Sequence, residues 1–168
     1  MQDSAGRLLL GLEIVDELPG LERVIVPASG CGLISGVGLA VKAANPHIEV
    51  IGINALHAPA LHNWLNNDQL PQIWDTLAEA LSGEIEAGSI TFNLVKQEVD
   101  RCLLVTEDAI AQAMRWLAFQ SGWIAEGGGA VGVAAVLSGV LPLDDRPTAI
   151  VISGGNVDEA TLRRVLSA

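Results

Sequence analysis

The chain has 168 residues, and its 20 acidic and 9 basic residues give a net charge of −11 without any basic stripe, which argues against a nucleic-acid partner. This length fits one domain over residues 1–168, with no linker or second domain. The uncharged stretch 127–143 is too short and too interrupted by glycine for a membrane span, which needs about 20 apolar residues, and the N-terminus lacks the pattern of a signal peptide.

The first third of the chain predicts a strand, helix, strand unit preceded by a helix. Residues 4–18 have apolar positions at helical spacing, and Pro19-Gly20 ends that pattern. The short β-branched run 23–27 is typical of an inner parallel strand, and the segment 33–44 is an apolar helix that we expect to be buried. A second strand is expected at 48–53.

The middle of the chain is less regular. Residues 57–66 and 75–81 are candidate helices, and 83–89 is expected to be a loop before 91–98. A third strand is predicted at 101–105.

Thr106 follows the third strand as an N-cap, with two acidic residues in the first turn of the next helix. A helix of small residues is expected at 129–138, and a fourth strand at 148–152. Asn156, with Glu159 three positions later, predicts a capping box on a last helix. Strands that alternate with helices indicate an α/β fold: an open parallel sheet with helices on both faces.

Two polar, glycine-rich corners each follow a strand directly. Their sequences are Ser29-Gly30-Cys31-Gly32 and Ser153-Gly154-Gly155-Asn156. Because ligands of open parallel sheets lie beyond the carboxyl ends of the strands, we expect both corners to face one crevice. The first corner can hold a phosphate through main-chain N–H groups and the start of a helix. No basic residue adjoins it in the sequence, so amides and the helix dipole are expected to hold the anion alone.

Other interpretations of the corners remain open. The glycines can serve only for close packing of helix on strand, and Ser153 can be an ordinary turn residue. A dinucleotide site would need G-x-G-x-x-G and an acidic residue at the end of the second strand. The glycines here are Gly30, Gly32 and Gly36, and that strand is followed by Asn54, so this site is disfavoured.

The motifs resemble those of the serine/threonine dehydratases, which are pyridoxal-phosphate enzymes of the tryptophan-synthase-β-like fold type II. The resemblance begins near Ala5 and runs to the end of the chain. It rests on seven segments in the family's order: PASGCGLISG (27–36), VIGIN (50–54), TLAEAL (76–81), GSITF (88–92), VTEDAI (105–110), EGGGAVGVAA (126–135) and ISGGNVD (152–158).

The resemblance implies that pyridoxal phosphate is the cofactor and that this chain corresponds to part of the large domain of such an enzyme. Ser29, Gly30, Cys31 and Gly32 would hold the cofactor phosphate. Ser153, with Gly154 and Asn156 in the same corner, would hydrogen-bond the pyridine nitrogen, and Glu126 would lie near the ring.

The chain departs from the family's pattern in several respects. The segment with the Schiff-base lysine is absent, and the two lysines present, Lys42 and Lys96, are interpreted as solvated surface residues. We therefore expect no catalytic residue and no Schiff base in this chain, which resembles the carboxyl-terminal half of the catalytic unit.

A divalent-cation site of some family members falls here on Asn54 and Ala60, so no metal is expected. His47, His57 and His62 have no ligand spacing. Cys31 replaces a glycine of the phosphate loop, which is tolerable if its φ is negative. The regulatory domain of the family has no counterpart in this sequence.

Two functions follow from these observations. The first is a serine/threonine dehydratase fragment, an ammonia-lyase that forms a 2-oxo acid and ammonia by β-elimination. It would be inactive by itself and completed by an amino-terminal half or a second copy of the chain. The second is a non-catalytic module that binds a phosphate ligand or assembles with a partner, which the high apolar content favours. A homo-oligomer is expected, and the two cysteines favour reduced thiols and the cytoplasm.

Overall fold

A computed structural model describes residues 2–83, 85 and 90–167. The strands are β1 (Arg23–Pro27), β2 (Glu49–Ala55), β3 (Arg101–Val105) and β4 (Thr148–Ile150). The α-helices are α1 (Gln2–Glu17), α2 (Gly32–Ala44), α3 (Ala60–Asn66), α4 (Ile90–Glu98), α5 (Glu107–Trp116), α6 (Gly127–Leu137) and α7 (Glu159–Ser167). A 3-10 turn, η1 (Glu79–Leu81), precedes α4, and a π-helical turn, η2 (Leu117–Ser121), follows α5.

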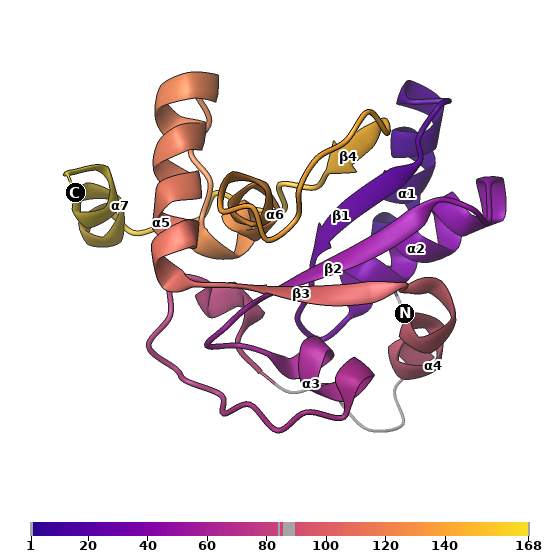
Figure 1. The fold of residues 1–168 in the computed structure, drawn as a ribbon, viewed down its shortest axis with the longest axis horizontal. Helices are drawn as coiled ribbons and strands as arrows, with labels where there is room; N and C mark the ends of the chain where they lie inside the picture. Colours follow the sequence, from indigo (N-terminus) through magenta and orange to yellow (C-terminus); the bar gives the residue numbers. More distant parts are fainter. Residues whose placement is uncertain (1, 84, 86–89, 168) are drawn as a thin grey trace.

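The four strands form one parallel sheet in the order β3-β2-β1-β4. Helices α1, α2 and α4 cover one face of the sheet, and α5 and α6 cover the other (Figure 1). The predicted open parallel α/β sheet with helices on both faces is therefore confirmed. The chain proceeds from β1 through β2 to β3 on one side of β1 and returns to the opposite side for β4, so the topology reverses between β1 and β4.

Each face of the sheet has its own buried core, as the period-two alternation of strand side chains requires. Ile25, Ile51 and Ile53 point into the core beneath α5 and α6. Val24 and Val26 alternate with them and pack against α2 and its neighbours. Both strands are buried on both sides, which is why the sequence of each reads as an almost continuous apolar run.

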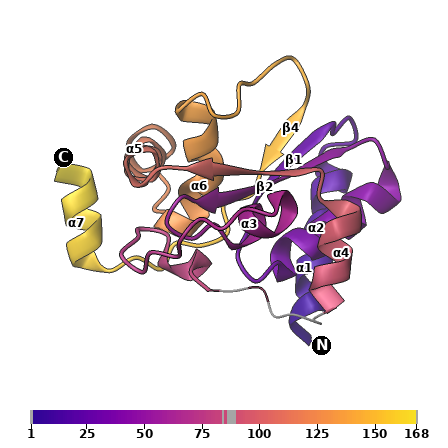
Figure 2. The same cartoon turned by 60° about the horizontal axis from the view of Figure 1, so that its bottom comes forward.

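Helices α1 and α2 approach each other closely through residues without side chains. A Cβ at Gly11 would lie 2.6 Å from Ala40 Cβ, and a Cβ at Gly36 would lie 2.9 Å from the main chain of Arg7. Contacts this short exclude any larger residue, so the glycines allow α1 to lie directly on α2. This packing fixes the first turns of α1 beside the start of α2, as Figure 2 also shows.

Several predicted boundaries agree with the structure. The first and third strands have the predicted bounds, and Thr106 caps α5 by accepting a hydrogen bond from the Ala109 N–H at 3.3 Å. The prediction of a helix over 75–81 is wrong except for η1. The reason is the Glu107 carboxylate, which accepts hydrogen bonds from Thr76 Oγ1 and Leu77 N, both at 2.7 Å, and so satisfies this segment without helical bonds.

The predicted capping box on the last helix is also wrong. Helix α7 begins at Glu159, and its N-cap is Asp158, whose carboxylate accepts a hydrogen bond from the Thr161 N–H at 2.9 Å. Hydrogen bonds from the Thr161 side chain and main chain lower the pKa of Asp158. Asn156 lies two residues before this cap, in the loop that follows β4.

Residues 88–89 of the GSITF segment, together with residues 84 and 86–89 of the predicted 83–89 loop, lie outside the described residues. Among the helices that are described, none has both the length and the apolar character needed to cross a membrane.

Asn54 ties the carboxyl ends of β1 and β2 to α3. Its side chain is fully buried, and its Nδ2 donates to the Ala28 carbonyl at 2.7 Å. Its Oδ1 accepts from the His62 N–H at 2.9 Å and from the Cys102 thiol at 3.3 Å. One carboxamide therefore fixes the chain just before the first glycine corner.

We predict that Asn54→Ala lowers the free energy of unfolding by about 2–4 kcal/mol, because it leaves a buried carbonyl and a buried N–H without partners. Urea denaturation checks this. Asn93→Ala, on the exposed side of α4, is the matched control and is expected to change stability by less than about 0.5 kcal/mol. Equal stability of the two variants would contradict the prediction.

Candidate functional site

The two glycine corners face one cavity of about 340 Å³ at the carboxyl ends of β1 and β4. The corners belong to neighbouring strands at the point where the topology reverses, where ligands of open α/β sheets bind. The cavity is lined by Arg7, Pro27, Ser29, Gly30, Cys31, Gly32, Leu33, Ala80, Leu81, Glu126 and Ser153.

The first corner is the short segment that connects the end of β1 at Pro27 to the start of α2 at Gly32. Helix α2 begins at Gly32, and its first N–H groups lie at the cavity wall. Gly30 lines the cavity too, and a Cβ there would meet no described protein atom within 4 Å. Its φ is not positive, so the backbone conformation does not require glycine. The absence of a side chain instead leaves open space in the cavity. Free N–H groups around such a space suit an anion.

Cys31 does not meet the condition under which it is tolerable, a negative φ. Its φ is +64°, in the left-handed region, and it is the N-cap of α2. The corner needs this conformation because β1 must turn directly into the helix, and a glycine would adopt it without the cost that a Cβ imposes.

The Cys31 side chain is buried and turns back toward the chain that precedes it, with Sγ 3.2 Å from the Ser29 carbonyl oxygen, to which the thiol donates. Burial raises the pKa of this thiol to about 12. Burial also raises the pKa of Cys102, and the nearby Cys31 raises it further. Both cysteines are free thiols, and neither is ionised at neutral pH, so neither supplies a nucleophile.

We predict that both thiols resist alkylation by iodoacetamide at pH 8 in the folded chain. With a pKa of about 12, roughly one Cys31 in ten thousand is a thiolate at that pH. Mass spectrometry of chains labelled with and without guanidinium checks this, since the unfolded chain reacts at both positions. Rapid labelling of folded Cys31 would contradict the buried geometry.

The same pKa shift has a consequence for stability at high pH. The unfolded thiol ionises near pH 9, whereas folded Cys31 ionises near pH 12. Because the folded chain holds the thiol proton more tightly than the unfolded chain does, the protonated thiol favours folding. This contribution to the free energy of unfolding is complete below pH 9 and is lost as the pH rises from about 9 toward 12.

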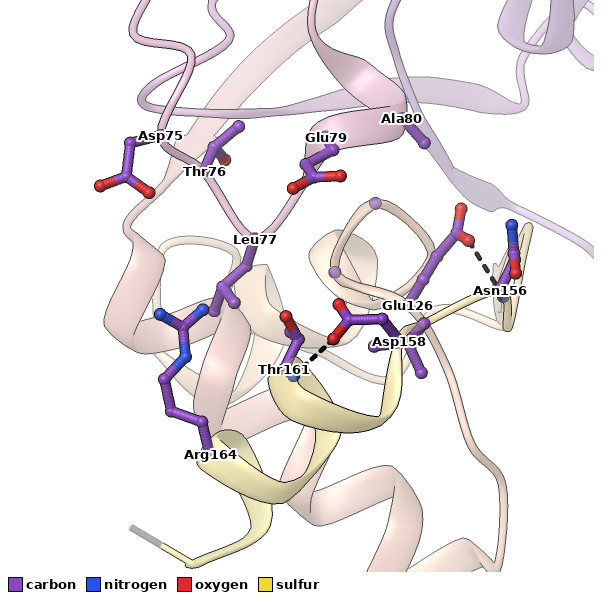
Figure 3. Close-up of a pocket in the computed structure, with 13 residues that line it drawn as sticks. Asp75, Thr76, Leu77, Glu79, Ala80, Glu126, Asn156, Asp158, Thr161 and Arg164 are labelled. Carbon is purple, nitrogen blue, oxygen red and sulfur yellow. Dashed lines mark hydrogen bonds between the residues drawn. The ribbon is translucent and has the colours of Figure 1, made fainter.

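The second corner is held by Glu126, the N-cap residue of α6. The Glu126 N–H donates to the Gly154 carbonyl at 3.1 Å, and its carboxylate accepts from the Asn156 N–H at 3.1 Å, which Figure 3 marks as a dashed line. A Cβ at Gly154 would lie 2.6 Å from the Glu126 carboxylate, so a larger residue here would displace that carboxylate from the corner. Ser153, at the start of the corner, lines the cavity.

The structure therefore brings six of the eight predicted binding residues to one cavity: Ser29, Gly30, Cys31, Gly32, Glu126 and Ser153. Gly154 packs against Glu126 behind them. Asn156 lies instead on a neighbouring cavity of about 420 Å³, which Glu126 and Ala80 share with the first (Figure 3). Asp75, Glu79, Asp158 and Arg164 contribute the charged groups of that second cavity.

Arg7 is the site residue that the sequence analysis missed. Its guanidinium reaches the start of α2 so closely that a Cβ on Gly32 would collide with Arg7 Nη1. The expectation that no cation adjoins the first corner is thus wrong. The signal for it lies in Gly11, Gly32 and Gly36, whose spacing on two neighbouring helices permits the close crossing that carries Arg7 to the cavity.

The two lysines lie away from the cavity. Lys42 is only partly solvated, contrary to expectation, because its Nζ pairs with the Asp100 carboxylate at 2.8 Å and ties α2 to the turn before β3. Lys96 is exposed on α4, as predicted. Neither of them lines the cavity.

The candidate metal position has no free ligand at Asn54, whose side-chain oxygen and nitrogen are both used in hydrogen bonds. Among the described residues no group of three or more His, Cys, Asp or Glu has a metal-binding arrangement. His57 contacts the Asp75 carbonyl at 2.8 Å and His62 contacts Asp68 at 3.1 Å, which agrees with the packing or surface roles expected for them.

Comparison with known proteins connects this chain to one family. The family model described as "Pyridoxal-phosphate dependent enzyme" matches residues 4–154. The L-threonine ammonia-lyase of Thermotoga maritima is 42% identical over 165 residues, which are 97% of this chain and 41% of that protein. The catabolic L-threonine dehydratase TdcB of Escherichia coli K12 is 34% identical over 96% of this chain and 50% of its own length.

Solved structures give the same result. The serine racemase of maize superposes with a TM-score of 0.85 at 31% identity, over 98% of this chain and 52% of that one. The processed form of threonine deaminase isoform 2 from Solanum lycopersicum has a TM-score of 0.85 at 26% identity, over 98% of this chain and 46% of its own. The chain thus spans about half the length of the relatives that it matches. It belongs to the pyridoxal-phosphate-dependent enzymes, with the fold of part of their large domain.

Proposed function

We propose that this chain forms the cofactor-binding part of a threonine or serine ammonia-lyase that uses pyridoxal phosphate. The single observation that supports this most strongly is the convergence of the two glycine corners on one cavity between β1 and β4. The names of the two relatives described above, a threonine ammonia-lyase and a threonine dehydratase, support the choice of reaction.

The donor groups of the cavity suit this cofactor at both of its ends. The start of α2 and the corner around Gly30 offer main-chain N–H groups and open space to a phosphate. Ser153 lies at the carboxyl end of the adjacent strand, and its hydroxyl can hydrogen-bond a ring nitrogen without transferring a full charge to it. A bound pyridoxal phosphate supplies the electron sink for breaking bonds at the substrate α-carbon.

The role of Glu126 is to hold the second corner in place. Its carboxylate fixes the Asn156 N–H and its N–H fixes the Gly154 carbonyl, so the turn that presents Ser153 has two anchors. The same carboxylate borders the cavity, near where the ring would lie. Gly154 keeps the distance between corner and carboxylate short.

The remainder of the enzyme is proposed to cover β4. This strand is the last of the described sheet, and it pairs with β1 through three residues. Apolar side chains are exposed beside it, among them Trp123, Ile124 and Ile152. Two cavities flank it, one against α1 and one against α5 and α6. An amino-terminal half with the reactive lysine, or a second copy of the chain, is the expected occupant.

We predict that Gly30→Val abolishes binding of pyridoxine 5′-phosphate, a cofactor analogue without the aldehyde, while leaving the thermal midpoint within a few degrees of the wild type. The valine side chain would fill open space in the cavity and meets no described protein atom at its Cβ. Quenching of tryptophan fluorescence measures binding, and circular dichroism measures the thermal midpoint.

The matched control is Gly20→Val, since Gly20 also has open space around its missing Cβ and a φ that valine tolerates, but lies in the turn after α1. It is expected to bind the analogue normally. Unchanged binding by Gly30→Val would show that the phosphate does not bind at the first corner, and it would overturn the proposed site.

We further predict that the 168-residue chain with pyridoxal phosphate releases no ammonia from threonine, because neither of its lysines lines the cavity. Co-expression with the amino-terminal part of the Thermotoga maritima relative should produce 2-oxobutanoate. A coupled assay for the 2-oxo acid checks both statements. Turnover by the chain alone would show that a lysine from another part is not needed.

A further inference from the structure

The guanidinium of Arg7 lies where a bound anion would make its contacts. Arg7 lines the same cavity as Ser29, Gly30 and Gly32, and its Nη1 occupies the position next to Gly32 at the first turn of α2. The residue is partly buried, and the packing of Gly36 on the Arg7 main chain holds it there. The guanidinium thus belongs to the wall of the cavity.

This placement has an electrostatic consequence. The start of a helix carries a partial positive charge, so a cation beside it is disfavoured by a fraction of a kcal/mol up to about 1 kcal/mol. An anion between the guanidinium and the helix start is attracted by both. Both groups therefore favour an anion at the same place.

The surrounding charge supports the same conclusion. The chain has a net charge of −11, and the Glu126 carboxylate borders the same cavity. A phosphate dianion entering there is repelled by both, and main-chain amides carry only partial charges to offset this repulsion. Arg7 brings a full positive charge to the cavity wall, and the planar guanidinium can donate two parallel hydrogen bonds to phosphate oxygens.

We propose that Arg7 binds the phosphate group of the cofactor together with the amides of the first glycine corner. The site is thus a cup of main-chain N–H groups closed by one guanidinium from α1. This inference rests on the proposed function, because it assumes that a phosphate enters the first corner. The alternative arrangement, in which the guanidinium fills the cup and competes with the phosphate, predicts the opposite effect of removing it.

The test compares pyridoxine 5′-phosphate with pyridoxine, which lacks the phosphate, by fluorescence quenching of the full 168-residue chain. Arg7→Gln should weaken binding of the phosphorylated analogue roughly tenfold to hundredfold, as expected for loss of a charge-assisted hydrogen bond, and should leave pyridoxine binding unchanged. The wild type should also lose more affinity for the phosphorylated analogue with added salt than Arg7→Gln does.

Arg163→Gln is the matched control, since it removes the same charge from an exposed arginine on α7 that pairs with Glu159 at 2.7 Å. It should bind like the wild type. Arg7→Lys keeps the charge and the apolar stem, so it serves if Arg7→Gln does not fold, as judged by circular dichroism. It should bind several-fold more weakly than wild type, because an ammonium cannot form the paired hydrogen bonds.

The possible results separate the two proposals. Equal or tighter binding by Arg7→Gln, with normal loss of binding in Gly30→Val, overturns the role of Arg7 and leaves the site in place. Equal or tighter binding by Arg7→Lys overturns it in the same way. If the wild type binds both analogues equally or neither of them, the phosphate site itself is wrong and the role of Arg7 falls with it.

Discussion

The parallel pairing of β1 with β4 decides where this protein can bind a ligand. The ladder is short and joins Arg23–Ile25 to Thr148–Ile150, yet it places the ends of two strands from opposite parts of the sequence side by side. Both strands then leave the sheet through glycine-rich corners that open into one cavity. The helices after β1 and before β4, α2 and α6, cover opposite faces of the sheet (Figure 1).

Close approach of main chain to main chain is the second requirement of this site. Gly36 allows α1 to reach α2, and Gly154 allows the loop after β4 to reach Glu126. In each contact a neighbouring segment fills the space that a side chain would take. The first contact brings Arg7 to the cavity, and the second brings Ser153 there. The small residues thus determine the chemistry of the site indirectly, through the distance between elements.

The order of the elements and the type of sheet were predictable from the sequence, because buried parallel strands such as β1 and β2 are short apolar runs bounded by clear turn residues. The position of the corners followed from the rule that ligands lie beyond strand ends. Six of eight predicted site residues line the cavity for that reason. The positions that agree with the structure are those that follow directly from the order of strands and turns along the chain.

The failures concern contacts between distant segments. The 75–81 segment has helical composition, but its hydrogen bonds go to the Glu107 carboxylate, which no local pattern reveals. Arg7 is remote from the corner in sequence and reaches it only through the crossing of α1 over α2. Cys31 takes a left-handed conformation because the chain must turn there, although its side chain disfavours it. In each case tertiary geometry overrode local preference.

The position of β4 at the end of the described sheet has a consequence for handling the protein. Its outer side presents main-chain N–H and C=O groups next to exposed Trp123 and Ile152, with no charged side chain among Thr148–Ile152 to discourage contact. Such an edge is a template on which another chain can add a strand. If the proposed partner does not cover β4, this edge favours aggregation in concentrated solution.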